Sequence, residues 1–220
     1  MATFAFIHGA GDVGWYWHLV EAELRLRGHD TVAPDLPIED DNAGLTEYAT
    51  AVIGAIGDRQ DVVVVAQSFG GYIAPIVAQG IDARLIVLVA AMIPSPGESA
   101  DEMFVSTRWE PARLEDASEL AVFYHDVPRE LAEEAVGRGR RQSDTPGREP
   151  WPLAAWPAIE TRFIVCRNDR FFPAPWLRGV VRDRLGIEPA EIDSGHCPAL
   201  SRPQELARLL DRYATEAIES

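Results

Sequence analysis

The chain has 220 residues, of which 47% are hydrophobic, and its formal net charge at pH 7 is −15. This length and apolar content suit one domain with a full core, alone or with an inserted subdomain. The negative charge would repel phosphate backbones, which argues against nucleic acid as a partner.

The N-terminal sequence and the two cysteines both favour an intracellular protein. The N-terminal stretch MATFAFIHGAG lacks the basic start and long apolar run of a signal peptide. No stretch of about 18 apolar residues predicts a membrane span. The two cysteines, Cys166 and Cys197, allow one disulfide but do not indicate a disulfide-stapled scaffold. We therefore expect a cytoplasmic protein without membrane association, and the sequence leaves a homodimer open.

Apolar runs alternate with helical patterns through most of the chain. Short apolar runs predict strands at Thr3–Ile7, Asp30–Ala33, Val62–Ala66, Leu85–Ala90, Phe163–Cys166 and Ala190–Ile192. Apolar residues at helical spacing predict helices over residues 15–26, 45–56, 72–79 and 174–185, and a closing helix around 206–213. Continuous apolar strands between helices are typical of a parallel sheet covered on both faces. We predict an α/β fold with a doubly wound, mostly parallel, six-stranded sheet.

The alternation is interrupted between the fourth and fifth strands. Residues 93–157 are rich in Pro, Glu and Arg and form too long a segment for a plain loop in a compact domain. Disorder is disfavoured because the segment contains several aromatic residues, among them Trp109, Trp151 and Trp156. We interpret it as a helical cap inserted into a core formed by residues 1–92 and 158–220.

The third strand ends in a serine between small residues, in the stretch VVAQSFGG. Ser68 falls at the carboxyl end of the strand, where parallel sheets bind ligands. A serine on so sharp a turn needs small neighbours two residues away on each side, and Ala66 and Gly70 meet this need, while Gly71 allows the next helix to pack closely. The pattern is typical of a nucleophile elbow. The alternative is a serine that only caps a helix.

A nucleophilic serine needs a base and a third group that orients the base. His196, in DSGHCP, follows the last strand and is the predicted base; the other histidines lie on helices, in the insertion or before a loop. Asp169 follows the fifth strand and is the predicted acid. Asp193 is its rival, although it precedes His196 by only three residues.

The loop HGAG after the first strand is the predicted oxyanion site. Small residues let a backbone approach a ligand closely, so one N–H is expected from Ala10 and another from Phe69, with His8 holding the loop. The stretch GAGDVG also matches the dinucleotide fingerprint, but Asp35 is not placed as the expected ribose carboxylate. We expect no cofactor and no metal.

Five stretches in this order, HGAG with Trp15 and Trp17, APDLP, AQSFGG, NDRFFP and SGHCP, resemble the α/β-hydrolase superfamily. The proportions are most similar to its small esterase, plant methylesterase and hydroxynitrile lyase branch. The resemblance implies ester hydrolysis through an acyl-enzyme on Ser68, with His196 and Asp169 completing the triad. Cys197 stands where the hydroxynitrile lyases carry lysine, which argues against cyanohydrin cleavage.

Aromatic residues of the insertion and of the loops predict an apolar pocket. The expected substrate-binding residues are Asp12, Trp15, Phe123, Tyr124, His125 and Phe171. Trp109, Trp151 and Met103 are expected to help roof the site. Small to medium carboxylic esters are the expected substrates. The alternatives are a biosynthetic acyl-transfer, cyclisation or lyase enzyme with the same triad, and a non-catalytic receptor for a small ligand.

Overall fold

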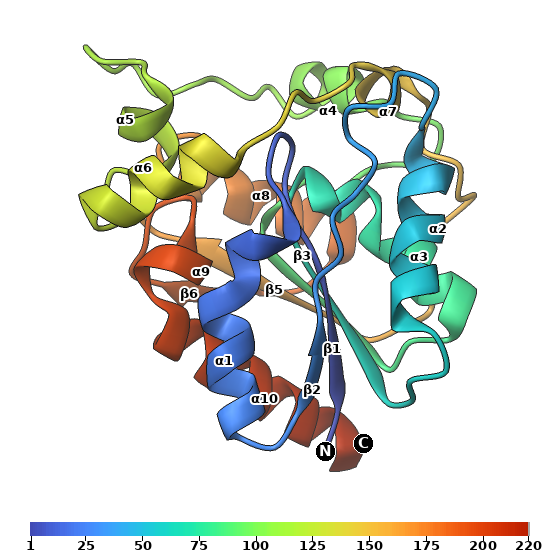
Figure 1. The fold of residues 1–220 in the computed structure, drawn as a ribbon. Coiled ribbons are helices and arrows are strands. Elements are labelled where there is room, and N and C mark those ends of the chain that lie inside the picture. Colours follow the sequence, from blue (N-terminus) through green and yellow to red (C-terminus); the bar gives the residue numbers. More distant parts are fainter. Residues whose placement is uncertain (220) are drawn as a thin grey trace.

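Six strands form one sheet in the computed structural model, which describes residues 1–219. The strand order is β2-β1-β3-β4-β5-β6, and all neighbouring strands are parallel (Figure 1). The strands are β1 (Thr3–Ile7), β2 (Asp30–Val32), β3 (Val62–Ser68), β4 (Leu85–Ala91), β5 (Thr161–Cys166) and β6 (Ala190–Ile192). The predicted α/β fold with a six-stranded parallel sheet is confirmed.

Helices cover both faces of the sheet, which explains why its central strands are apolar throughout. Every residue of β4 is buried, as is every residue of β3 before Ser68. One face packs against α1 (His18–Leu26), α9 (Pro198–Ser201) and α10 (Pro203–Glu219). The other packs against α2 (Leu45–Ile56), α3 (Ala74–Ile81) and α8 (Ala174–Leu185). Each helix in the described part of the chain is too short or too polar to pass through a bilayer.

The strand order places a crevice beside β1 and β3. The chain moves from β1 outward to β2 and then returns to β3 on the other side of β1, so the winding direction changes between these two strands. Ligands of doubly wound sheets bind at the carboxyl ends of the strands on either side of such a switch point. Here those ends lead into the Gly9–Gly11 loop and into Ser68.

The segment between β4 and β5 lies over the carboxyl ends of the strands (Figure 1). It contains four short helices joined by irregular chain: α4 (Ala100–Ser106), α5 (Glu119–Phe123), α6 (Arg129–Arg138) and α7 (Thr145–Arg148). The position fits the cap that the sequence predicts. Its division from the core remains a prediction, since the segment packs directly on the sheet and its helices.

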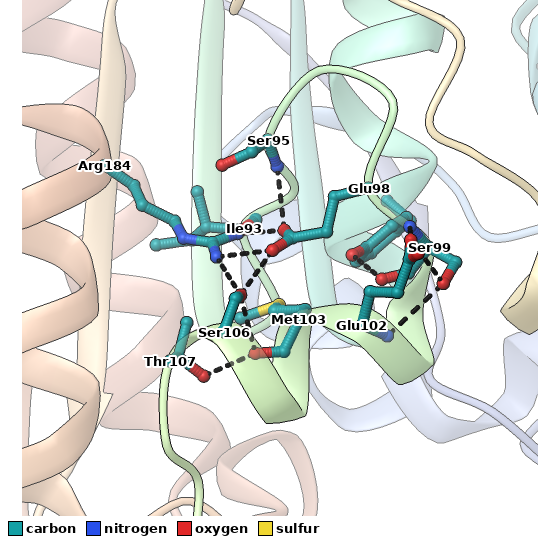
Figure 2. Close-up of polar contacts among 10 residues, drawn as sticks. Ile93, Ser95, Glu98, Ser99, Glu102, Met103, Ser106, Thr107 and Arg184 are labelled. Atoms are coloured by element: carbon teal, nitrogen blue, oxygen red, sulfur yellow. Dashed lines mark hydrogen bonds and ion pairs between the residues drawn. The ribbon is translucent and has the colours of Figure 1, made fainter.

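A nearly buried ion pair anchors the start of this segment. Figure 2 shows Arg184 of α8 reaching the carboxylate of Glu98, which also accepts hydrogen bonds from the Ser106 hydroxyl at 2.5 Å and the Ser95 N–H at 3.1 Å. The side chains of Arg184 and Glu98 are only 13% and 11% exposed. Burial alone would raise the pKa of Glu98, but the bonds from Arg184, Ser106 and Ser95 outweigh it and lower that pKa.

Candidate active site

Ser68 adopts a strained backbone conformation at the end of β3. Its φ of 52° and ψ of −125° lie where residues with a side chain are rarely found. A Cβ added to Gly70 would lie 3.0 Å from the carbonyl oxygens of Ile7 and His8, and one added to Gly71 would lie 2.0 Å from that of Met92. Glycine at both positions therefore allows the turn. The Ser68 side chain makes no capping hydrogen bond to the following 3₁₀ turn, which argues against a purely structural serine.

His196 and Asp169 form a buried pair beside this turn. His196 Nδ1 lies 2.7 Å from Asp169 Oδ2, and the two side chains are 4% and 0% exposed. Asp169 Oδ1 accepts hydrogen bonds from the N–H groups of Phe171 and Phe172 at 2.8 and 2.9 Å, which fixes the carboxylate. Because a carboxylate only accepts, Nδ1 carries the proton and Nε2 is left free to act as a base. The rival Asp193 instead accepts a hydrogen bond from the Asn168 side chain at 2.9 Å.

Ser68 and His196 line one cavity of about 140 Å³. Among the described residues 1–219, no hydrogen bond joins the Ser68 hydroxyl to His196. Such catalytic bonds are often long without substrate and shorten when the substrate binds. The shared cavity is thus the geometric link between the strained serine and the His196–Asp169 pair.

The loop after β1 passes close to Ser68. A Cβ on Gly9 would lie 3.0 Å from Ser68 Cβ and 2.6 Å from Gln67 Oε1, so only glycine permits the approach. His8 holds the loop: its Nδ1 bonds to the Gly9 carbonyl at 2.8 Å, and its Nε2 accepts from the Leu36 N–H at 3.1 Å. Burial lowers the pKa of His8 to about 4, which keeps the ring neutral for both bonds.

Residues of the insertion hold the same loop from above. The Gly11 N–H donates to Gln142 Oε1 at 3.2 Å, and the Gly11 carbonyl accepts from the Arg140 N–H at 2.8 Å. Asp35, considered above as a ribose carboxylate, accepts from the Gly14 N–H and from the Arg140 side chain at 2.8 and 2.9 Å. These bonds give the GAGDVG stretch and Asp35 a structural role without a dinucleotide. No set of His, Cys, Asp and Glu side chains within the described residues is grouped as a metal site would require.

Four of the six residues expected to bind substrate line the cavity with Ser68: Asp12, Phe123, Tyr124 and Phe171. Trp15 and His125 are not among the lining residues, and their role in substrate binding stays a prediction. The Trp15 ring stacks on His18, with 4.3 Å between centroids, and lies under the Arg138 guanidinium at 4.6 Å. His125 Nε2 bonds to the Asn168 carbonyl at 3.0 Å.

The residues expected to roof the site mostly serve the core instead. Met103 and Trp151 are buried, and Trp151 Nε1 donates to the Tyr72 carbonyl at 3.1 Å. Trp109 Nε1 donates to the Phe171 carbonyl at 2.9 Å, so it supports a residue of the cavity wall. The apolar character that suggested a roof here reflects packing of the insertion on the sheet.

Asp126 contacts the loop that carries His196, a role missed in the sequence. Its Oδ2 accepts a hydrogen bond from the Gly195 N–H at 2.7 Å, and its Oδ1 is buried without a hydrogen-bond partner among the described residues. A Cβ on Gly195 would lie 2.6 Å from Asp126 Oδ1 and 2.7 Å from His125 Nε2. The N-cap residue of α6 is Pro128, so Asp126 does not cap that helix. The glycine before His196 was the only local signal of this close approach.

Ser68 also lines a second cavity. It measures about 330 Å³ and shares Ala10, Ser68 and Phe171 with the first. Phe69, Met92 and Phe104 contribute apolar lining, and Asp101, Asp144 and Arg148 contribute charged lining. The serine therefore borders two compartments of different size and lining.

Asp12 lines the cavity that contains Ser68 and His196. Burial raises the pKa of Asp12 to about 7; His196 opposes this rise, and Glu119 adds to it. Among the described residues, none donates a hydrogen bond to its side chain, while its backbone N–H donates to the Gly9 carbonyl at 3.4 Å. Asp12 thus lines the cavity without a hydrogen-bonding partner for its carboxyl group.

Sequence and structure comparisons agree on the family. The profile described as the alpha/beta hydrolase family matches residues 4–209, and the chain belongs to this family. Methylesterase 7 of Arabidopsis thaliana is 27% identical over 96% of this chain and 97% of its own. Norfluorocurarine synthase 1 of Strychnos nux-vomica is 23% identical over 98% and 96%. The crystal structure of polyneuridine aldehyde esterase superposes with a TM-score of 0.81 at 20% identity, covering 97% of this chain and 99% of its own. These similarities place the chain in the esterase-like branch of the family.

Proposed function

We propose that this protein is a serine esterase whose triad is Ser68, His196 and Asp169. The Ser68 hydroxyl attacks the ester carbonyl while His196 Nε2 takes its proton, and Asp169 holds the imidazole in the required tautomer. The N–H groups of Ala10 and Phe69 stabilise the oxyanion. His196 then returns the proton to the leaving alcohol, and water, activated by the same base, releases the acid. The observation that carries the proposal is the His196–Asp169 bond of 2.7 Å at the cavity that also contains Ser68.

The two compartments support a division between acyl group and alcohol. The leaving oxygen must lie within reach of His196, so the alcohol belongs in the cavity of about 140 Å³ that contains this residue. The acyl group then occupies the larger cavity lined by Phe69, Met92 and Phe104. Small to medium apolar acids fit this wall. The esterase names of two of the relatives support an ester as substrate.

A fluorophosphonate probe and a series of p-nitrophenyl esters of rising acyl length test the proposal. Wild-type protein should bind the probe covalently at Ser68 and turn over the esters, and Ser68→Ala should lose both. Asp169→Asn should lower kcat by about a thousandfold or more, because the imidazole loses its tautomer, whereas the matched Asp193→Asn should stay near wild type. Half of the wild-type activity in Ser68→Ala would rule the mechanism out.

A biosynthetic reaction on the same triad is the second candidate. It is supported by the similarity to norfluorocurarine synthase 1 over nearly the whole chain. A non-catalytic receptor remains the third, and it would not react with the probe at a useful rate. Probe labelling without turnover of any p-nitrophenyl ester would favour the biosynthetic reaction over the esterase.

A further inference from the structure

We propose that the cavity beside His196 is a subsite for a cationic leaving group. It would bind the ammonium group of an amino-alcohol ester through the Asp12 carboxylate, with the exposed Glu119 and the rings of Phe123, Tyr124 and Phe171 also lining the cavity. This inference rests on the proposed esterase function and specifies the alcohol half of its substrate.

The lining of this cavity has an unbalanced charge. Asp12 and Glu119 are its two carboxylates, and apart from the imidazole of His196 no basic side chain is among its lining residues in the described part of the chain. The arginines nearest in sequence to the lining are already engaged: Arg138 with Glu134, Arg140 with Asp35, and Arg170 with the Ala121 carbonyl. A cation entering the cavity meets attraction and no fixed positive charge from arginine.

Asp12 lacks the partner that a carboxylate in a confined site normally has. A carboxyl group removed from water is costly to ionise unless it is paired. Burial raises its pKa to about 7, and no hydrogen bond to the side chain offsets that rise. An ammonium group in the cavity would supply it and favour the ionised form.

The aromatic rings add a second recognition element. The Phe123 and Phe171 ring centroids lie 5.0 Å apart, and they lie 5.2 and 5.5 Å from that of His196 at interplanar angles of 58° and 78°. Both rings line the cavity, and aromatic rings attract ammonium groups, most strongly where water is excluded. Carboxylates and aromatic rings around one small cavity fit an alkylammonium better than a neutral alkyl group.

The cationic group belongs to the alcohol half of the ester rather than to the acid half, because the leaving alcohol must receive a proton from His196. Only the compartment that contains His196 allows the leaving oxygen to receive its proton. A volume of about 140 Å³ limits the alcohol to a small one. The net charge of −15 would in addition raise the concentration of cationic esters near the protein.

A pair of isosteric esters tests the subsite. The choline ester and the 3,3-dimethylbutyl ester of acetic acid differ in charge but hardly in shape, and kcat/KM for each is measured by acid release. We expect wild-type protein at about pH 8 to prefer the choline ester by about tenfold or more, the ratio that one charge pair of modest strength provides. In Asp12→Asn the ratio should fall to near one, and in Glu119→Gln it should fall part of the way. Using the ratio within each variant cancels any general loss of activity.

Glu115→Gln is the matched control, because it removes one negative charge at an exposed residue outside the cavity lining. Its ratio should equal that of the wild type. The wild-type ratio should also rise between about pH 6 and pH 8, as Asp12 ionises, and should be flat in Asp12→Asn. The charges of His196 and Glu119 act on Asp12, and Asp12 in turn acts on Tyr16, Tyr124 and Cys197.

Two kinds of result separate this inference from the function on which it rests. Equal kcat/KM for the two esters, a preference that survives in Asp12→Asn, or turnover of p-nitrophenyl esters without turnover of the choline ester would each overturn the cationic subsite alone. Absence of turnover for every ester, together with absence of probe labelling at Ser68, would overturn the esterase itself.

Discussion

Replacing Asp12 with asparagine should stabilise the folded protein at alkaline pH. The pKa of this carboxyl rises from 3.8 to about 7 on folding because it is buried. Between these values the unfolded chain has already ionised while the folded protein still holds the proton, so stability falls as pH rises from about 4 to about 7. A shift of about three pKa units corresponds to about 4 kcal/mol. Because the side chain retains some access to the cavity, we expect a gain of about 2–4 kcal/mol in the variant above pH 7.

Urea unfolding of both proteins near pH 4 and near pH 8 measures this effect. The difference between variant and wild type should be small at the lower pH, because Asp12 is protonated in the folded state and half protonated in the unfolded one. Groups common to both proteins cancel in that difference. Glu115→Gln, which removes an exposed charge, should show no such pH dependence. A difference that is the same at both pH values, or a variant less stable at pH 8, would refute the reasoning.

Three further predictions concern positions around the site. Asp126→Ala should lower kcat by about tenfold with little change in KM, because it removes a charge-assisted hydrogen bond to the loop that carries His196. Asp126→Asn keeps an acceptor, so its kcat should stay within about threefold of wild type. Equal losses in both variants would show that Asp126 does not position His196. Glu98→Gln should lower the free energy of unfolding in urea by about 3 kcal/mol near pH 7, and adding Arg184→Met should restore part of that stability. Because the pKa of Glu98 is lowered on folding, the loss of stability should fade as the pH drops through that pKa. Gly71→Ala places a Cβ 2.0 Å from a carbonyl oxygen and should prevent native folding, while Gly54→Ala, with open space around it in α2, should gain about 0.5–1 kcal/mol by thermal unfolding.

The sheet could be predicted because its strands have a simple physical requirement. Strands covered on both faces must be apolar along their whole length, and the valine run of β3 meets this requirement. The predicted strands at Thr3–Ile7 and Ala190–Ile192 match the structure residue for residue, as does the helix at Ala174–Leu185. The start of α3 was less well predicted, because a 3₁₀ turn over Phe69–Tyr72 precedes it. Apolar spacing does not distinguish a tight turn from the first turn of an α-helix.

The site was predictable only where strand ends determine it. Ser68 is the last residue of β3 and His196 lies in the loop after β6 of the same parallel sheet, so topology brings both to a common edge. Trp15 and His125 lie outside the cavity lining, because aromatic and imidazole groups suit packing and hydrogen bonding as well as ligand contact. The bond between Asp126 and the Gly195 N–H joins residues 69 positions apart, and no local pattern encodes it.

The segment between β4 and β5 does more than cover the cavity, because it holds each of the loops that the proposed mechanism requires. Arg140 and Gln142 bond to both sides of Gly11 in the oxyanion loop, while His125 and Asp126 bond to the loops that carry Asp169 and His196. A change in this segment would thus displace the oxyanion donors relative to the base, even if no substrate contact were lost. Misplaced catalytic groups weaken transition-state binding more than ground-state binding, so substitutions along this contact should reduce kcat before they raise KM. A segment that served only as a lid would produce the opposite order.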